Sequence, residues 1–306
     1  MAGAPAMPLR QRLQDEPMTT IDAGTQAGKQ AGKQAGKQAG HELQVRTVDL
    51  GGQVLRTGIR RGRDAGPPLL IFNGIGANFE LLKPFVEALP DFEVILFDVP
   101  GVGGSPAPLV PYRFSNLCVL ADRLLSHLGY DGQVDTLGVS WGGALAQEFA
   151  RLHAHRCRRL VLAATSPGVI MVPGRLSVLS KMIGLRRYTD PQYLRRVGAD
   201  LYGGALRHDP AWLDEHGRHM QPPRGRGYLY QLLAAWGWSS LPWLGALKQP
   251  TLVMHGTDDP IVPLLNARIL AAAIPHATLQ LVDDGHLFLV TGADSAARAI
   301  GSFLRA

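Results

Sequence analysis

The stretch Gly138-Val139-Ser140-Trp141-Gly142 decides how the rest of the chain is interpreted. An apolar run, Val134–Leu137, precedes it, and a helix-like run begins at Gly143. This order predicts a strand, an abrupt turn and a helix, with a serine at the turn. Glycine has no Cβ, so strand and helix can approach closely while Ser140 takes a strained conformation with its hydroxyl exposed. The pattern is typical of a nucleophile elbow.

Length and composition bound the remaining possibilities. The chain has 306 residues of which 46% are hydrophobic, enough to bury a sizeable core as one domain with an insertion. Its formal net charge of +6 is spread over several segments, so we do not expect nucleic-acid binding. Two cysteines, Cys118 and Cys157, both in helix-like contexts, make no disulfide framework and favour a reducing compartment. No run of ~18 uncharged apolar residues predicts a transmembrane segment, and no secretory signal is recognised, so a soluble cytoplasmic protein is expected.

The first 42 residues differ in composition from the rest. The tetrapeptide Ala27-Gly28-Lys29-Gln30 is repeated at 31–34 and 35–38. A tract rich in Gly, Ala and Gln and without aromatic residues cannot bury enough apolar surface to offset its ordering entropy. We therefore predict a disordered low-complexity tail over 1–42; a weak contact of its lysines with an anionic or granular surface is the alternative.

From residue 43, short apolar runs alternate with helix-like runs. The first two, Val45–Leu50 and Val54–Ile59, flank Gly51-Gly52 and predict an antiparallel hairpin. Unbroken Val-, Ile- and Leu-rich runs separated by helices follow at Leu69–Phe72, Val94–Phe97, Val134–Leu137, Leu160–Ala163, Leu252–His255 and Leu279–Val282. Such alternation predicts an α/β fold with a mostly parallel, eight-stranded sheet flanked by helices.

The alternation is interrupted once. Residues 169–248 carry several helix-like runs with Pro and Gly interruptions and no strand-helix repeat. We predict a hydrolase core over 43–168 and 249–306, and a helical lid over 169–248, inserted after the sixth strand and lying above the elbow.

A serine nucleophile needs a base and an acid, which in this fold follow it along the chain as Asp or Glu and then His. His286 lies in the loop after the last predicted strand, where the base is expected. The loop after the preceding strand holds both Asp258 and Asp259, and either could orient the imidazole. Asp283 and Asp284 are too close to His286 in the chain to face it, and we expect them to be solvated in the loop.

An oxyanion hole needs two backbone N–H groups near the serine. We assign them to Trp141, directly after the serine, and to Ile75 in the Gly-rich loop 73–78. Asn73, at the start of that loop, is a candidate substrate-binding residue.

The predicted lid contributes two further candidates. Trp236 and Trp238 lie among leucines there, which indicates either packing within the lid or an apolar substrate groove. His153, His155 and Cys157 resemble a metal cluster, but they lie after the elbow helix in a basic segment that is expected to be exposed, so no metal site is predicted.

From about Val45 to Leu304 the chain resembles the intracellular depolymerases of medium-chain-length polyhydroxyalkanoates, which are α/β hydrolases acting on bacterial storage polyesters. The resemblance rests chiefly on Phe72–Asn78, Gly138–Gln147 and Asp284–Leu289. It implies that Ser140 and His286 are catalytic and that the acid is Asp259, the aspartate directly before Pro260. The AGKQ tail lies outside it.

The resemblance implies a cytoplasmic, granule-associated serine hydrolase that cleaves polyester bonds through an acyl-enzyme and needs no cofactor. Its partners would be the polymer and the granule surface. Two alternatives remain open: a general carboxylesterase or lactonase acting on soluble esters, and a non-catalytic granule-coat protein.

Overall fold

The computed structural model describes residues 42–209 and 211–306. The predicted disordered tail, apart from residue 42, lies outside these residues.

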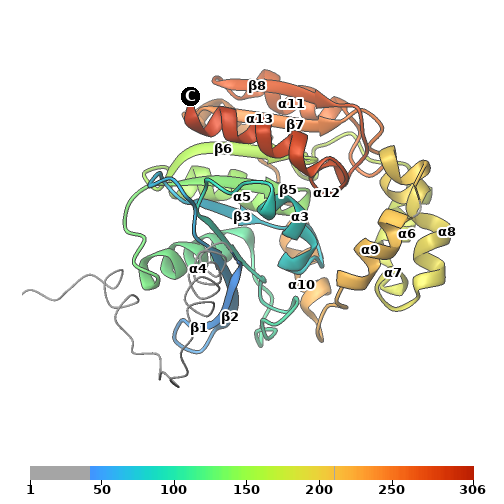
Figure 1. Cartoon of the computed structure of the whole chain (residues 1–306), viewed down its shortest axis with the longest axis horizontal. Coiled ribbons are helices and arrows are strands. Elements are labelled where there is room, and N and C mark those ends of the chain that lie inside the picture. The colour runs from blue at the N-terminus through green and yellow to red at the C-terminus, as the bar shows by residue number, and fades with distance from the viewer. Residues whose placement is uncertain (1–41, 210) are drawn as a thin grey trace, which may run out of the picture.

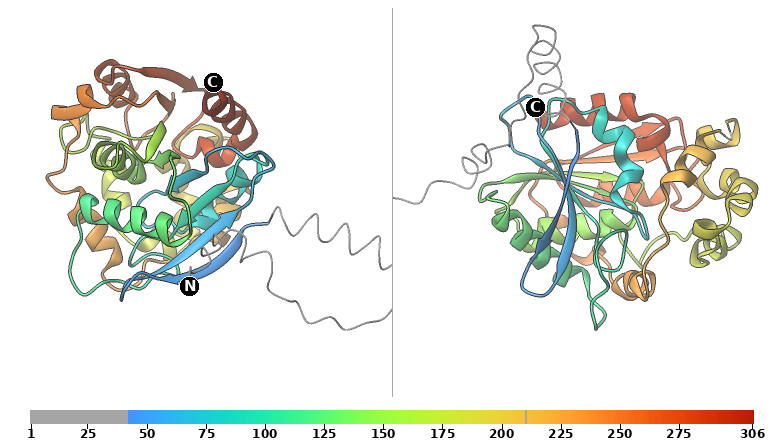
Figure 2. Two further views of the ribbon diagram at one scale, coloured as in Figure 1. Left: turned by 90° about the vertical axis from the view of Figure 1, so that its left-hand side faces the viewer. Right: turned by 60° about the horizontal axis from the view of Figure 1, so that its bottom comes forward.

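An eight-stranded sheet forms the centre of the protein and confirms the predicted α/β hydrolase architecture (Figure 1). Its strand order is β1-β2-β4-β3-β5-β6-β7-β8. The pairs β1–β2 and β2–β4 are antiparallel, and the pairs from β4 through β3 to β8 are parallel. The strands are β1 Gln44–Asp49, β2 Val54–Arg60, β3 Leu69–Phe72, β4 Val94–Phe97, β5 Val134–Val139, β6 Cys157–Ala163, β7 Thr251–Gly256 and β8 Ala277–Val282. Figure 2 shows the β1–β2 hairpin extending along one edge of the molecule.

Helices cover both faces of the sheet, which explains why the central strands are unbroken apolar runs. In β3, Leu70 and Phe72 pack into one core, and Leu69 and Ile71 into the other, because successive side chains point to opposite faces. The first core is closed by α4 Phe114–His127, α5 Trp141–Leu152 and α11 Leu265–Ala273. The second is closed by η1 Phe79–Leu82, α3 Lys83–Glu87, α12 Phe288–Thr291 and α13 Ala293–Arg305.

A helical insertion joins β6 to β7, within the segment predicted as a lid. It contains α6 Leu176–Ile183, α7 Arg186–Thr189, α8 Pro191–Tyr202, η2 Gly204–Arg207, α9 Ala211–His219, α10 Gly227–Ala235 and η3 Leu241–Ala246. Helices α6 to α9 gather at one end of the molecule, and α10 lies closer to the sheet (Figure 1). The insertion has a small core of its own, in which Leu194, Leu201 and Leu213 pack against Ile261 and Val262 of the hydrolase core.

One local expectation was wrong. Cys157 opens strand β6 and is not in a helix. The basic segment around it predicts an exposed position, but Cys157 is buried and Arg158 pairs with Asp135 of the neighbouring strand, with 2.6 Å between Nη2 and Oδ2. Both cysteines are buried free thiols, and burial raises the pKa of Cys157 to about 12.

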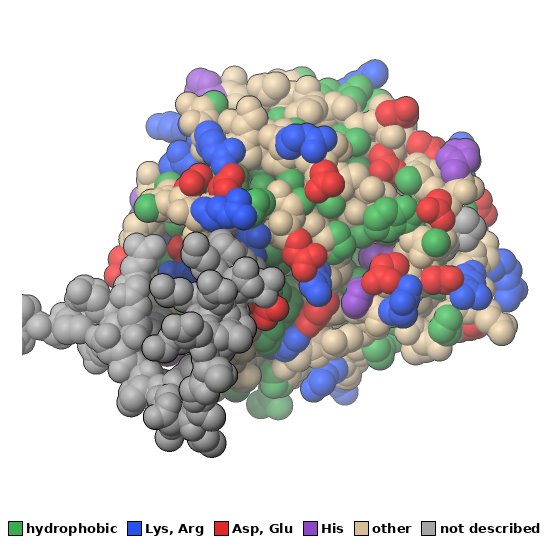
Figure 3. All heavy atoms as spheres, viewed as in Figure 1, with side chains coloured by type: hydrophobic (Ala, Val, Ile, Leu, Met, Phe, Trp, Pro, Cys, Tyr) green, Lys and Arg blue, Asp and Glu red, His purple; other side chains and the backbone are tan. Residues whose placement is uncertain are grey.

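Charged side chains of both signs are interspersed on the face shown in Figure 3. Among the described residues, no helix is long and apolar enough to span a bilayer.

Candidate active site

Ser140 occupies the sharp turn between β5 and α5. Its backbone has φ 54° and ψ −118°, which is strained for a residue with a Cβ. Three hydrogen bonds anchor this residue: its N–H donates to Ala163 O at 2.9 Å, and its carbonyl accepts from Gly143 N at 2.9 Å and from Thr165 Oγ1 at 2.7 Å. The strained conformation is therefore maintained by hydrogen bonds of the Ser140 backbone, and its hydroxyl takes no part in them.

The elbow glycines are required by close backbone approach. A Cβ on Gly142 would overlap the carbonyl oxygens of Phe72 and Asn73, and one on Gly138 would overlap Gly142 O. The strand and the helix can therefore meet around Ser140 only with hydrogen at these positions.

His286 and Asp259 form a buried hydrogen-bonded pair. The distance between His286 Nδ1 and Asp259 Oδ2 is 2.7 Å, and Asp259 Oδ1 accepts from the N–H groups of Ile261 at 2.9 Å and Val262 at 3.0 Å. A carboxylate can only accept, so we assign the shared proton to Nδ1, which leaves Nε2 as an acceptor. Ser140 and His286 line the same cavity, and within the described part of the chain no hydrogen bond joins their side chains.

Asp258, the other candidate acid, turns toward the helical insertion. Its Oδ2 accepts from Arg207 Nε at 2.6 Å and from Gly204 N at 2.8 Å. The hydrogen bond from Arg207 holds the pKa of this exposed carboxyl below its usual range. The structure thus brings Asp259, and not Asp258, to His286.

The histidine loop is tied to the insertion. His286 N–H donates to Tyr202 O at 2.7 Å, and Asp284 Oδ1 accepts from Ala205 N at 2.8 Å. Asp284 Oδ2 also accepts from Thr291 Oγ1 at 2.6 Å. The expectation that Asp284 is solvated is therefore wrong: it is buried and anchors the loop, whereas Asp283 is exposed.

A second histidine, His255, lies 3.6 Å from Asp259 Oδ2 but does not line the cavity. It is fully buried, its Nε2 lies 2.8 Å from Val262 O, and burial lowers its pKa. His255 is therefore a neutral packing residue, which leaves His286 as the partner of Asp259 that reaches the cavity.

The loop 73–78 curls against the serine. An added Cβ on Gly74 would lie 3.7 Å from Ser140 Cβ. Asn73 lines the cavity, but its side chain serves the loop: Oδ1 accepts from Gly74 N at 2.8 Å, and Nδ2 donates to Asn78 O at 2.9 Å. Asn73 therefore shapes the turn that presents Ile75.

Gln231 on α10 holds both proposed oxyanion segments in place, and sequence reasoning did not find it. Its Oε1 accepts from Gly76 N, and its carbonyl accepts from Trp141 Nε1, at 2.8 and 2.9 Å. Trp141 is the first residue of α5, so its N–H has no partner within the helix. No hydrogen bond of the Ile75 N–H occurs among the described residues, so both groups are free to donate to a ligand.

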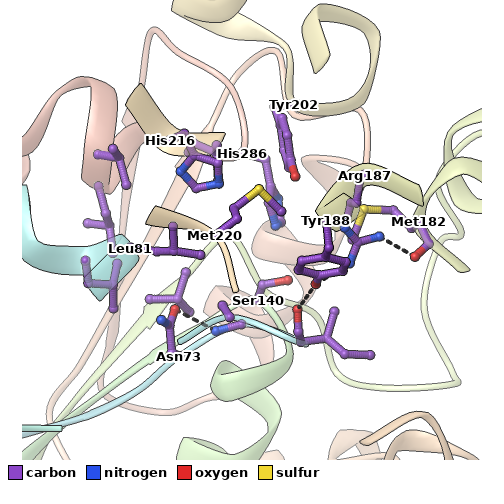
Figure 4. Close-up of a pocket in the computed structure, with 18 residues that line it drawn as sticks. Asn73, Leu81, Ser140, Met182, Arg187, Tyr188, Tyr202, His216, Met220 and His286 are labelled. Carbon is purple, nitrogen blue, oxygen red and sulfur yellow. Dashed lines mark hydrogen bonds between the residues drawn. The ribbon is translucent and has the colours of Figure 1, made fainter. Parts of the chain in front are cut away.

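The cavity around Ser140 and His286 has mainly apolar walls. In Figure 4, Ser140, His286 and Met220 share one space, with Leu81 and His216 on one side and Arg187 and Met182 on the other. The lining residues include Ile75, Leu81, Leu82, Val139, Met182, Met220, Leu287, Leu289 and Val290. Several come from the insertion, whose irregular sequence offered no periodicity from which to predict them.

Trp236 and Trp238 are not among the residues that line the cavity around Ser140 and His286. Trp236 ends α10 and is 84% exposed. Trp238 packs against Phe114 with 5.1 Å between ring centroids, and its Nε1 donates to Glu148 at 3.1 Å. The physical reason is that α10 turns Gln231 toward the elbow, so the residues at its end lie outside the cavity.

In the described residues, no group of three or more His, Cys, Asp and Glu could hold a metal ion.

Comparison with known proteins agrees with this architecture. The model of the alpha/beta hydrolase fold family matches residues 67–293. The poly(3-hydroxyalkanoate) depolymerase of Ectopseudomonas oleovorans is 52% identical over 85% of this chain and 92% of its own length. A pimeloyl-[acyl-carrier protein] methyl ester esterase of Aromatoleum aromaticum is 29% identical over 78% of this chain and 98% of its own. The enol-lactonase of Burkholderia xenovorans LB400 superposes with a TM-score of 0.73 at 24% identity, covering 85% of this chain and 100% of the lactonase, a likeness of fold. The chain therefore belongs to the alpha/beta hydrolase fold family, as an ester hydrolase.

Proposed function

We propose that this protein is a serine hydrolase that cleaves the ester bonds of medium-chain-length poly(3-hydroxyalkanoate) storage granules. The observation that carries the proposal is the meeting of Ser140 and His286 in one cavity with largely apolar walls. The 52% identity to a poly(3-hydroxyalkanoate) depolymerase supports the polyester as substrate.

In the proposed mechanism, Ser140 Oγ attacks the ester carbonyl while His286 Nε2 takes the hydroxyl proton. Asp259 orients the imidazole and stabilises its cationic form, and the N–H groups of Ile75 and Trp141 stabilise the oxyanion. The C–O bond then breaks, and His286 gives its proton to the leaving hydroxyl. Water, activated by the same histidine, hydrolyses the acyl-enzyme. The steps call for no cofactor.

The walls of the cavity favour substrates with alkyl side chains. Leu81, Met182 and Met220 come from both the core and the insertion, so a bound side chain would be enclosed. Each buried methylene contributes about 0.8 kcal/mol, so medium-chain monomers gain more than short-chain ones.

The test is release of 3-hydroxy acids from isolated granules of medium-chain and short-chain polyester in parallel. We expect release from the medium-chain polymer and little from the short-chain one. Cleavage of soluble esters without release from either polymer would contradict the proposal and favour a general carboxylesterase or lactonase. Granule binding without hydrolysis of any ester would favour a coat protein.

An exposed apolar surface supports granule association in the cytoplasm. Leu229 and Leu233 share one face of α10, and Trp236 directly follows this helix; their exposed fractions are 51%, 45% and 84%. The loop carrying Leu109 and Val110 packs beside α10, since Tyr230 OH donates to Leu109 O at 3.3 Å. We call these five residues the α10 patch. Hydrophobic side chains protrude at the lower edge of Figure 3, where Figure 1 places this loop next to α10.

Exposed apolar side chains gathered on one surface are typical of a site that binds an apolar partner. We therefore expect the double variant Leu109→Ser/Trp236→Ser to bind granules at least about tenfold more weakly in cosedimentation. Hydrolysis of a soluble ester should stay near the wild-type rate. Leu281 on β8 is 44% exposed and lies outside the α10 patch. The variant Leu281→Ser is the matched control and should bind granules as the wild type does. If the wild type, the double variant and Leu281→Ser bind granules equally, the α10 patch is not the docking surface.

A further inference from the structure

Arg187 is a buried cation that has no carboxylate partner among the residues that the structure describes. It lies in α7 of the helical insertion and is only 3% exposed. Its guanidinium donates to Met182 O, to Tyr188 OH at 2.8 Å and to Tyr228 OH at 3.1 Å, all of them neutral groups. The adjacent Arg186, by contrast, is exposed and forms an ion pair with Asp190 at 3.0 Å.

The cavity provides no counter-charge for this cation. Arg187 is the one permanently charged side chain among the described residues that line it. Burial opposes the charge, but the surrounding tyrosines raise the pKa of Arg187, so the guanidinium stays protonated. A buried charge without an opposite charge is costly, and an anionic ligand would relieve that cost.

The guanidinium still has donors to offer. It carries five N–H groups in a planar fork, and the hydrogen bonds described above use three of them. A guanidinium binds carboxylates and phosphates through charge-assisted hydrogen bonds, and of these two groups the proposed hydroxy-acid substrate carries a carboxylate. Because Nη2 donates to both tyrosines, the N–H groups left for a ligand are that of Nε and one of Nη1.

Arg187 is also coupled to the reaction centre. Its neighbour Tyr188 donates to Ile75 O at 3.1 Å, on the loop that carries the proposed oxyanion donor. Figure 4 shows Arg187 on one side of Ser140 and His286, and Leu81 and His216 on the other. A substrate with its ester at Ser140 can therefore extend toward the guanidinium in one direction and toward apolar walls in the other.

His216, on the opposite side, adds no charge. It is buried, its Nδ1 has no partner among the described residues, and burial lowers its pKa to about 4. Near neutral pH the imidazole is uncharged and can form a hydrogen bond with a neutral polar group of a bound substrate. The two ends of the cavity thus differ: one suits an anion and the other a neutral segment.

We propose that Arg187 binds the free carboxylate at the end of a hydroxy-acid oligoester, which makes the enzyme prefer carboxylate-terminated chain ends. This inference rests on the proposed function. In such a polyester the leaving hydroxyl belongs to the unit on the carboxyl side. Attack by Ser140 therefore breaks the C–O bond to the carboxyl-terminal portion, which takes the proton from His286 and leaves as a hydroxy acid. The remainder of the chain is the acyl group, released by water.

The test uses 3-(octanoyloxy)octanoic acid and its methyl ester, with release of octanoic acid from the internal ester as the readout. Both compounds share the scissile bond and differ only in the charged end. For the wild-type enzyme we expect kcat/KM to be at least about tenfold higher for the free acid, because a buried charge-assisted hydrogen bond is made to the acid alone. Arg187→Met should lower the acid-to-ester ratio to one or below, chiefly through KM for the acid. Arg186→Met is the matched control and should keep the wild-type ratio.

If the wild-type enzyme has equal kcat/KM values for the acid and the methyl ester, the inference is overturned. This comparison needs no variant, so the inference can be tested even if Arg187→Met does not fold. An undiminished acid preference in folded Arg187→Met would overturn it as well. Because these substrates are soluble, the result is separable from the proposed function. Granule hydrolysis without acid preference refutes only the role of Arg187, and acid preference without granule hydrolysis refutes only the polymer substrate.

Discussion

Replacing Ser140 with alanine is expected to lower kcat for ester hydrolysis by about 10⁴-fold or more, because Ser140 is the only Ser, Thr or Cys among the described residues that line the cavity. Stability should change little. The strained turn is held by the backbone N–H and carbonyl of Ser140, which bond to Ala163, Gly143 and Thr165, and alanine keeps all three bonds.

The measurement is steady-state turnover of a soluble ester together with urea unfolding. Ser295 is an exposed serine on α13, and its hydroxyl donates to Gly292 O at 2.9 Å. The variant Ser295→Ala serves as the matched control. Wild-type rates in folded Ser140→Ala would remove the elbow serine from the mechanism.

Asp259→Asn should cost about 10³- to 10⁴-fold in kcat, and Asp258→Asn far less. Asp259 Oδ2 accepts from His286 Nδ1 at 2.7 Å. An amide nitrogen at that position would favour the wrong imidazole tautomer and would not stabilise the imidazolium. Asp258 loses only an exposed ion pair with Arg207, whose contribution to stability is within about 1 kcal/mol.

Parallel kcat measurements on the two asparagine variants decide the assignment, with thermal unfolding to confirm that both are folded. Because the two residues are adjacent, they control for each other in loop position and in chemical change. A larger loss in Asp258→Asn would transfer the acid role to that residue and imply that the insertion moves during catalysis.

Much of the fold could be predicted from the sequence because its causes are local. The elbow glycines leave room for carbonyl oxygens that an added Cβ would overlap, so their spacing around Ser140 already indicates strand, turn and helix. The central strands are buried on both faces, so they appear as unbroken apolar runs such as Leu69–Phe72. The position of His286 follows from chain order, since the carboxyl ends of parallel strands meet at one edge of the sheet.

Tertiary structure alone decided which of two adjacent aspartates faces His286. Asp258 and Asp259 are the same residue type in the same loop. The difference comes from Arg207 and Gly204 of the insertion, which hydrogen-bond the carboxylate of Asp258 and hold it away from His286. The resemblance to a known family implied Asp259, but the residues themselves left the question open.

The walls of the cavity were also decided only by the folded chain. Arg187 and His216 come from an irregular segment far from Ser140 in sequence, and they line the cavity because the helices of that segment pack back onto the core. Gln231, from the same segment, reaches Gly76 beside the cavity for the same reason. Trp236, which the sequence suggested as a cavity residue, ends on the outer surface for the same reason. The local sequence thus determined the sheet, the elbow and the order of Ser140 and His286, because steric and solvation preferences act within a few residues. The shape and charge of the cavity depend on long-range packing, which no local pattern encodes.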